Sequence, residues 1–172
     1  MTATPAWTVR PAGPDDTSAL ALVGAATFLE TFAGVIDGSA ILGHCTANHA
    51  AQSYASLFAK GARAWLGEAQ GGAPVGYALI AEPDLEAARA GDIELKRIYA
   101  LSRFHGSGLG GALMEAAVAG ASGRDRLLLG VKADNHRAIA FYRKQGFEPI
   151  ATRQFNVGGK LFDDLVLARP LA

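Results

Sequence analysis

Four glycines fall within six positions of this chain, at Gly106, Gly108, Gly110 and Gly111. Glycine has no Cβ, so a phosphate can approach such a backbone closely. A helix that begins in this stretch would have first N–H groups without partners inside the helix, and its aligned peptide dipoles would add partial positive charge there. The spacing therefore predicts a backbone site for a pyrophosphate. The alternative, which glycines alone would favour, is a tight turn that binds no ligand.

Two familiar phosphate-binding motifs are excluded. A P-loop needs lysine and then serine or threonine after its second glycine, whereas Gly111 is followed by Ala112. Residues 106–111 do fit GxGxxG, but a dinucleotide site also needs an acidic residue about 20 residues further on. Asp125 comes too early, in a loop before the next expected strand.

A strand and a helix must position these glycines. Residues 92–100 contain Ile93, Leu95, Ile98 and Tyr99, which suit a half-buried strand. After the glycines, residues recur at steps of three and four that mark one face of a helix: Leu109, Ala112, Leu113, Ala116, Ala117 and Gly120. We therefore expect a strand, a glycine-rich turn and a helix in immediate succession.

These residues resemble the acetyl-coenzyme A motif of the GCN5-related N-acetyltransferase (GNAT) family. The motif has Gln or Arg, two residues, Gly, one residue, then Gly or Ala; here His105 replaces Gln or Arg, and Gly108 and Gly110 are the glycines. A second register, beginning at Arg103, fits the pattern literally but places the Gly-Leu-Gly signature two residues out, so we prefer the first. The resemblance implies acetyl-coenzyme A contacts at Ile98, Tyr99, Ala100, His105, Gly106, Ser107, Gly108, Leu109, Gly110 and Gly111.

A second motif runs from Asn135 to Phe147 and resembles the family's Asn, aromatic-Tyr, Gly-Phe signature. The resemblance implies that Asn135 hydrogen-bonds the pantetheine arm. It also implies that Tyr142 contacts the cofactor and acts as the general acid for the departing thiolate, since a phenol with a pKa of about 10 can protonate a thiolate in a dry site. The alternatives are a helix N-cap for Asn135 and a core aromatic for Tyr142.

The implied reaction is direct attack of a neutral amine on an acetyl thioester, which needs a donor for the carbonyl oxygen and a route for the amine proton. A backbone N–H near Tyr99 can be that donor if a bulge opens the ladder and splays the next strand. The alternation from Asp92 to Lys96 is broken by Ile98 and Tyr99, which indicates such a bulge. Glu94 is the expected base; the alternative is a surface carboxylate paired with Lys96.

The remaining pattern predicts an α/β protein with a mixed sheet of about six to seven strands, helices on both faces and splayed central strands. Expected strands are residues 7–10, 64–69, 75–81, 92–100, 127–131, 149–155 and 161–168. Expected helices run from about 15 to a break at 30–34, over 39–60 with Leu42 among the residues that face inward, from the glycine run, and over 136–145. This order is that of the GNAT fold, so the resemblance covers most of the chain.

Composition limits the remaining possibilities. At 172 residues, 50% of them hydrophobic, the chain suits one domain over residues 1–172. Lys+Arg and Asp+Glu each number 16, so no net charge draws it to nucleic acid or an anionic membrane. Cys45 is the single cysteine, which excludes an intrachain disulfide and a cysteine metal cluster, and we expect no metal site. No apolar run suits a membrane span, and we expect a cytoplasmic protein, with a homodimer as its assembly.

In this family the expected helix pair before residue 60 forms one wall of the acceptor site. Glu30 and Phe32 are the expected substrate contacts, with His44 and Tyr54 as further candidates; core packing or a solvated surface is the alternative for each. Residues 30–32 and 98–100 weakly resemble the polyamine-acetylating branch.

An acidic acceptor pocket made by Glu30, Glu82 and Asp92 would favour that branch. The branch that acetylates a ribosomal protein N-terminus has a glutamate where this chain has Gly130, so that substrate is discounted.

The leading hypothesis is therefore an acetyl-coenzyme A-dependent N-acetyltransferase that acts on a primary amine of a small molecule, polyamine-like or amino-acid-like. The rivals are a protein or peptide N-acetyltransferase and a non-catalytic sensor of acyl-coenzyme A. Tyr142 argues against the sensor, since a sensor needs no acid.

Overall fold

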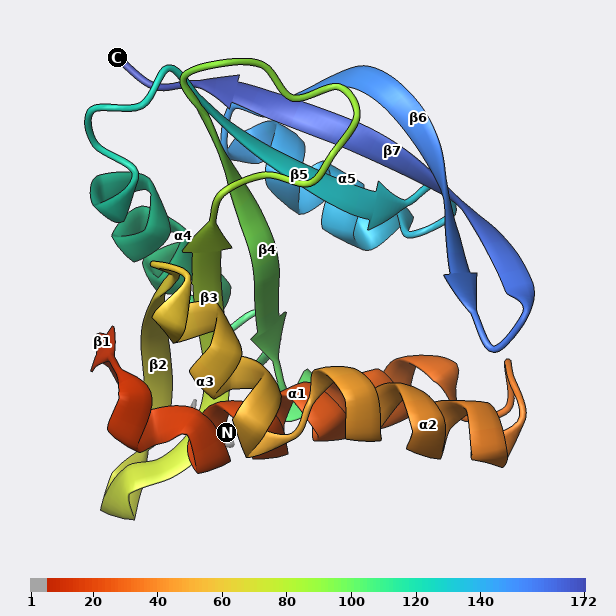
Figure 1. Cartoon of the computed structure of the whole chain (residues 1–172). Coiled ribbons are helices and arrows are strands. Elements are labelled where there is room, and N and C mark those ends of the chain that lie inside the picture. The colour runs from red at the N-terminus through yellow and green to blue at the C-terminus, as the bar shows by residue number, and fades with distance from the viewer. Residues whose placement is uncertain (1–5) are drawn as a thin grey trace.

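The structure is a computed structural model that describes residues 6–172, and one seven-stranded sheet organises it (Figure 1). The strands are β1 (Trp7–Ala12), β2 (Arg63–Ala69), β3 (Ala73–Ala81), β4 (Asp92–Ala100), β5 (Arg126–Lys132), β6 (Glu148–Val157) and β7 (Lys160–Pro170). Their order is β1-β2-β3-β4-β5-β7-β6. Only β4 and β5 pair in parallel among these neighbours. The expected mixed sheet is confirmed.

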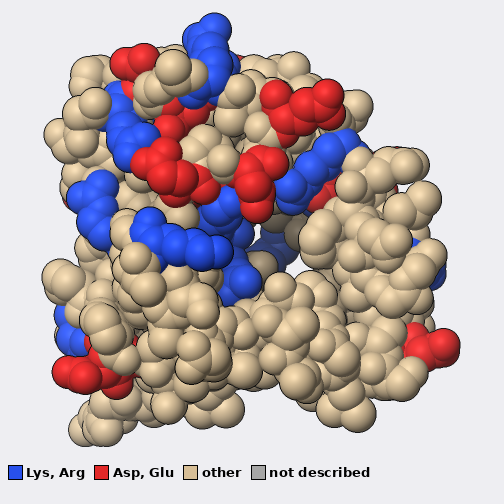
Figure 2. Space-filling model, viewed as in Figure 1, with Lys and Arg blue, Asp and Glu red and all other residues tan. Residues whose placement is uncertain are grey.

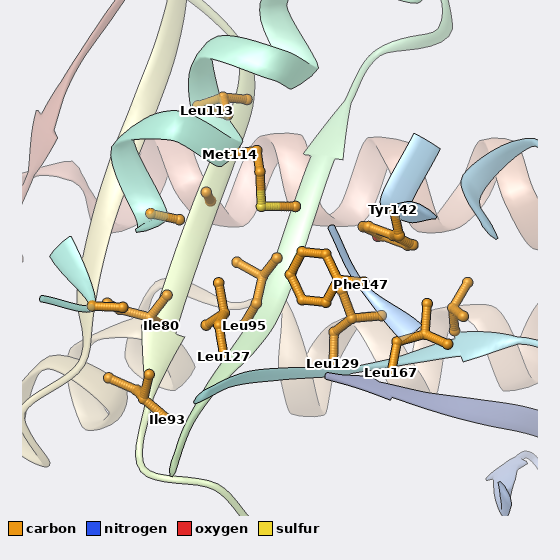
Figure 3. Packing of buried hydrophobic residues seen from close by; sticks show 14 of the residues in the cluster. Ile80, Ile93, Leu95, Leu113, Met114, Leu127, Leu129, Tyr142, Phe147 and Leu167 are labelled. Carbon is orange, nitrogen blue, oxygen red and sulfur yellow. The ribbon is translucent and has the colours of Figure 1, made fainter. Parts of the chain in front are cut away.

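Helices cover both faces of the sheet. They are α1 (Thr17–Phe32), α2 (Gly38–Asn48), α3 (Ala51–Ala59), α4 (Leu109–Gly120) and α5 (His136–Lys144). α1 and α3 pack on one face, around Leu20, Tyr54 and Leu79. α4 and α5 pack on the other, in a cluster that Figure 3 shows from close by. None of these helices is long and apolar enough to cross a membrane, in the part of the chain described.

α4 rests closely on the sheet because two glycines make room for it. Leu109 and Leu113 are fully buried against β2, β3 and β4. A Cβ at Gly67 would lie 2.8 Å from the Leu109 side chain, and one at Gly76 would lie 2.8 Å from the carbonyl oxygen of Tyr99. The first turn of α4 is therefore fixed directly beside the end of β4.

β4 has a bulge at Lys96. Leu79 of β3 faces Arg97, and Ile80 faces Leu95, so Lys96 is the extra residue. Ile93 and Leu95 before the bulge pack on the α4 face, and after it the even-numbered Ile98 and Ala100 do so. The bulge indicated by the broken alternation is confirmed, three residues ahead of Tyr99.

β4 and β5 pair over only three residues and then separate. The pairs run from Asp92 opposite Arg126 to Glu94 opposite Leu128, whereas β5 continues beside β7 to Lys132. Figure 1 shows β4 and β5 diverging, with α1 and α2 running across the lower side of the opening. The expected splay is confirmed, and it leaves one edge of β4 without a strand partner beyond Glu94 in the described chain.

The structure corrects three expectations about the first helices. The single helix predicted over 39–60 is two helices, α2 and α3, which separate at His49 and Ala50. His49 is buried and its Nδ1 lies 2.9 Å from the hydroxyl of Tyr54; residues five apart face about 140° away from each other on a continuous helix, so this contact requires the chain to turn.

The break expected at 30–34 is also wrong in part, because α1 continues through Glu30 to Phe32 and ends before Gly34, whose φ is 79°. Leu42, expected to face inward, is 71% exposed. On α2 it lies about 100° around the helix from the buried Ile41, away from the core.

The β6–β7 hairpin closes the far side of the opening. Its Val157 packs with Phe28 and Phe32 of α1 and Ile41 of α2 in a separate small cluster. The hairpin, α1 and α2 together therefore form a wall that faces the separation between β4 and β5.

Candidate active site

A cavity of about 500 Å³ lies where β4 and β5 separate. Its walls come from α1, α2, β4, the end of β5, α5 and the β6–β7 hairpin. Figure 2 shows the hollow, with Lys and Arg side chains gathered along it and Asp and Glu side chains above. Ten sequence-predicted site residues line it: Glu30, Phe32, His44, Glu94, Ile98, Tyr99, Ala100, His105, Asn135 and Tyr142.

The glycine turn lies beside this cavity rather than in its walls. Gly106 and Gly108 have φ values of 77° and 89°, and Gly108 is the N-cap of α4. The first backbone donor that bonds within α4 is the Ala112 N–H, which donates to the Gly108 carbonyl at 3.1 Å. The N–H groups of Gly110 and Gly111 thus lack a helical acceptor.

The turn is also open to an approaching anion. A Cβ at Gly106 or Gly111 would meet no atom within 4 Å. The Ser107 hydroxyl accepts from the Leu109 N–H at 3.3 Å, and the Leu109 side chain is fully buried. Only the backbone of Leu109 is therefore left for a cofactor contact.

The open edge of β4 continues from this turn. The Leu101 N–H donates to the Val75 carbonyl of β3 at 2.9 Å. Because antiparallel strands alternate the direction of their N–H groups, the Tyr99 N–H also points to β3, and those of Ile98 and Ala100 point to the open side. The backbone N–H donor that we expect near Tyr99 is therefore that of Ile98 or Ala100.

His105 binds the chain itself. Its Nε2 donates to the carbonyl of Ala100 at 3.0 Å in the tautomer that protonates this nitrogen. The ring is exposed at the edge of the cavity. His105 therefore ties the end of β4 to the start of the glycine turn.

Tyr142 is a buried phenol at the cavity. It is 9% exposed and lies beside Phe147, with ring centroids 5.9 Å apart (Figure 3). Its hydroxyl has no hydrogen-bond partner among residues 6–172, so its proton is free for a ligand. Burial, with a smaller effect from Tyr99, raises the pKa of Tyr142 well above the ordinary value, so the group stays protonated at neutral pH.

Glu94 combines features of both sequence interpretations. It pairs with Lys96, whose Nζ lies 2.7 Å away, but it is buried, with 4% exposure, rather than on the surface. The backbone N–H of Asp84 also donates to it, at 3.1 Å. Burial raises the pKa of Glu94 although Lys96 opposes the shift, which brings this carboxylate closer to the range of a general base.

Asn135 has the expected capping role and retains a free group. Its Oδ1 accepts from the backbone N–H of Ala138 at 3.2 Å, which makes it the N-cap of α5. The side chain also lines the cavity, so its amide NH₂ can bind a ligand. The capping and binding interpretations are compatible.

The wall made by α1 and α2, where the acceptor is expected to lie, is aromatic. Phe28 lies stacked on His44 with ring centroids 4.0 Å apart, and 4.4 Å from Phe32. Glu30 accepts from the N–H and the hydroxyl of Ser102, at 3.2 and 2.9 Å, and so joins the end of α1 to the turn after β4. Tyr54, the other candidate, is fully buried and does not line the cavity.

The acidic pocket that Glu30, Glu82 and Asp92 could have made, and that would have favoured the polyamine branch, does not form. Glu82 pairs with Arg124, and Asp92 pairs with Arg126 at 2.6 Å. Neither carboxylate lines the cavity, because both lie toward the other end of β4. Two of the three carboxylates that would attract a polyamine are therefore neutralised elsewhere, and of the three only Glu30 lines the cavity.

Sequence reasoning missed several charged groups that line the cavity, among them Arg97, Arg153 and Asp164. Arg153 donates to Asp164 at 3.3 Å, and the second carboxylate oxygen of Asp164 is buried without a partner in the described chain. Gly130 makes room for this pair, since a Cβ there would lie 2.5 Å from Arg153. The signal in the sequence that could have indicated these residues is a charged residue within a strand, but this signal does not show which face of the sheet the side chain lies on.

Comparison with known proteins gives consistent matches. The model of the acetyltransferase (GNAT) family matches residues 42–147. An uncharacterised N-acetyltransferase of Mycobacterium tuberculosis (strain H37Rv) is 34% identical over 158 residues, which cover 91% of this chain and 98% of that protein. One of Mycobacterium bovis matches to the same extent.

Solved structures share the fold. The PaiA N-acetyltransferase of Thermoplasma acidophilum, in complex with coenzyme A, superposes with a TM-score of 0.77 at 17% identity, over 96% of this chain and 99% of that one. YncA of Salmonella typhimurium, with its cofactor acetyl-coenzyme A, gives a TM-score of 0.71 at 20% identity, over 97% and 95% of the two chains.

Proposed function

Since this chain belongs to the GNAT family of acetyltransferases, and is thus an acyltransferase that uses acetyl-coenzyme A, we propose that it acetylates the primary amine of a small molecule by direct attack. The observation that carries the proposal is the cavity at the separation of β4 and β5, which Glu94, the open edge of β4 and Tyr142 all border. It supports a site where an amine can meet a thioester beside a buried acid and a buried base.

The chain's own residues fit the cofactor. The unpartnered N–H groups of Gly110 and Gly111 suit a diphosphate. The open backbone groups of Ile98 and the N–H of Ala100, with the Asn135 amide, suit the amides of a pantetheine arm, in the manner of an added strand. When bound, acetyl-coenzyme A supplies the acetyl thioester.

Three groups then serve the transfer. Of the two open N–H groups, that of Ile98 is nearer than that of Ala100 to the point where β4 and β5 separate. The Ile98 N–H polarises the carbonyl oxygen of the thioester. Tyr142 holds its proton for the departing sulfur, and Glu94 accepts the proton that leaves the amine, directly or through water. Glu30 and Phe32 border the acceptor end. A cytoplasmic location and a homodimer, expected from the sequence, stay predictions.

The proposal is tested by release of free thiol from acetyl-coenzyme A in the presence of a panel of amines. In Tyr142→Phe we expect turnover to fall about 100-fold or more, the usual size of a general-acid contribution, with binding of coenzyme A retained in calorimetry. Tyr77→Phe is the control, since it removes a buried hydroxyl that does not line the cavity. Unchanged turnover in Tyr142→Phe would remove Tyr142 from the mechanism.

The same assay separates the enzyme from a sensor. If acetyl-coenzyme A raises the thermal midpoint but no amine releases thiol, the protein binds the cofactor without transfer to small amines. That outcome contradicts the proposed activity and favours the sensor.

A further inference from the structure

Arg97 is a half-buried cation for which the described chain supplies no carboxylate within 4 Å. Its Nη1 donates to the backbone carbonyl of Asn48 at 3.1 Å, and the guanidinium lies 5.0 Å from the centre of the Tyr54 ring. These contacts hold the side chain but do not neutralise it. Taking such a charge out of water is costly without a counter-ion.

The other buried charges of the cavity are already paired. Lys96 lies between Glu94, at 2.7 Å, and Asp84, at 3.0 Å. Arg153 pairs with Asp164 at 3.3 Å. Lys132 lies 3.6 Å from an exposed aspartate, and Arg137 is exposed to water at the start of α5. Uncompensated positive charge away from water is therefore concentrated at Arg97.

The bulge places Arg97 toward the acceptor. Because Lys96 is the extra residue, Arg97 and Tyr99 share the face of β4 that carries α1 and α3. Ile98 takes the opposite face, against α4. Arg97 thus extends toward the wall made by α1 and α2, away from the glycine turn.

The two neighbouring imidazoles, His44 and His49, add no positive charge. Burial, with a further effect from Arg97, lowers the pKa of His44, and the same causes lower the pKa of His49 to about 3. Both imidazoles are therefore neutral at pH 7. The acceptor end combines one free guanidinium with neutral rings, including Phe28, and with Glu30, whose carboxylate accepts two hydrogen bonds from Ser102.

A guanidinium has five N–H donors in a planar fork, and Arg97 uses one of them on Asn48. Two parallel donors match the two oxygens of a carboxylate, which is the geometry that Arg recognises best. We propose that Arg97 binds a carboxylate of the acceptor, so that the acceptor is an amino acid or another small amine that carries a carboxylate. This inference rests on the function proposed above, and it opposes a polyamine, whose second ammonium would be repelled by Arg97.

The first experiment compares amines that differ only by the carboxylate: L-ornithine with putrescine, L-lysine with cadaverine, and L-phenylalanine with phenethylamine. We expect the wild-type protein to prefer the carboxylated member by about 10- to 100-fold in kcat/KM, the effect of a charged hydrogen bond. Equal use of both members, or preference for the decarboxylated one, overturns the inference while leaving the acetyltransferase activity established.

The second experiment removes the planar guanidinium of Arg97. In Arg97→Gln and Arg97→Lys the preference between the members of a pair should fall at least tenfold, mainly through KM of the carboxylated amine. Arg97→Lys keeps a cation over Tyr54 and guards against loss of folding, which circular dichroism checks. Arg63→Gln is the matched control, since Arg63 is exposed on β2 and lies outside the cavity. An unchanged preference in both Arg97 variants refutes the assignment.

A third measurement places the anion. Arg97 also borders a second hollow of about 480 Å³ between α2 and α3. With 3-phenylpropionate as the probe, we expect inhibition competitive with L-phenylalanine and weaker binding by Arg97→Gln in calorimetry. Non-competitive inhibition would place the carboxylate in the second hollow and contradict the inference. If no amine releases thiol, the proposed function fails, and equal binding of this probe by wild type and Arg97→Gln would overturn the inference separately.

Discussion

Gly24→Ala is a substitution for which local propensity and tertiary packing predict opposite signs. Gly24 is buried within α1, and alanine in place of an interior helical glycine ordinarily stabilises a helix by about 1 kcal/mol. In this structure a Cβ at Gly24 would lie 2.4 Å from both His49 Nδ1 and the Tyr54 hydroxyl. Packing therefore opposes propensity at this position.

The size of the effect follows from the groups that must move. Tyr54 is fully buried, and its hydroxyl lies 2.9 Å from His49 and 2.5 Å from the hydroxyl of Tyr77. Displacing it breaks at least one buried hydrogen bond, which costs about 1–3 kcal/mol, and overpacking of a core costs a similar amount, about 1–3 kcal/mol. After the gain in helix propensity of about 1 kcal/mol, we expect a net loss of about 3 kcal/mol.

The free energy of unfolding can be measured by urea titration at pH 7, followed by tryptophan fluorescence. For a chain of this length a loss of about 3 kcal/mol lowers the thermal midpoint by roughly 6–12 °C. The control is Gly43→Ala in α2, where a Cβ would meet no atom within 4 Å and helix propensity acts alone, with a gain of about 0.5–1 kcal/mol. A Gly24→Ala protein as stable as wild type, or more so, would refute this account of the His49–Tyr54–Tyr77 contacts.

Two further predictions concern carboxylates of β4. A base must be deprotonated to act, and burial raises the pKa of Glu94, so we expect kcat/KM to fall on the acid side at a pH above the ordinary glutamate pKa of about 4.3. Glu94→Gln should lower turnover and remove this acid limb of the pH profile. An acid limb that persists in Glu94→Gln would assign it to another group. Arg126 holds the pKa of Asp92 below its ordinary value, so this pair stabilises the fold fully above about pH 4 and loses its effect as pH falls through the lowered pKa of the folded state. Asp92→Asn should therefore cost about 3 kcal/mol at pH 7 and less at pH 3.5 in urea unfolding, and an equal cost at both pH values would contradict the pairing.

Much of the fold was predictable because its signals are local. The strand over residues 92–100, the glycine turn and α4 lie close together in sequence, and each shows in the spacing of apolar residues and glycines. The second motif is equally compact, from the N-cap Asn135 to Phe147. The sequence also indicated the bulge, since Ile98 and Tyr99 break the alternation of apolar and polar residues in the strand.

The errors share a different cause. The separation of α2 from α3 depends on His49 meeting Tyr54, and neither residue by itself ends a helix. Glu82 and Asp92 are candidates for a common pocket in the sequence because they are acidic, but Arg124 and Arg126 neutralise them at the other end of β4. Charge type is visible in a sequence, whereas the partner of a charge depends on the folded chain.

The sequence alone thus determined that a glycine turn begins a helix after a bulged strand, that Asn135 and Tyr142 follow at a family-like spacing, and that the sheet is mixed. Only the tertiary structure decided that the bulge falls at Lys96, which turns Arg97 toward the acceptor wall together with Tyr99. The physical reason is that periodicity arises from the backbone geometry of a few adjacent residues. The surroundings of a side chain arise instead from strand register and from contacts between residues far apart in the chain.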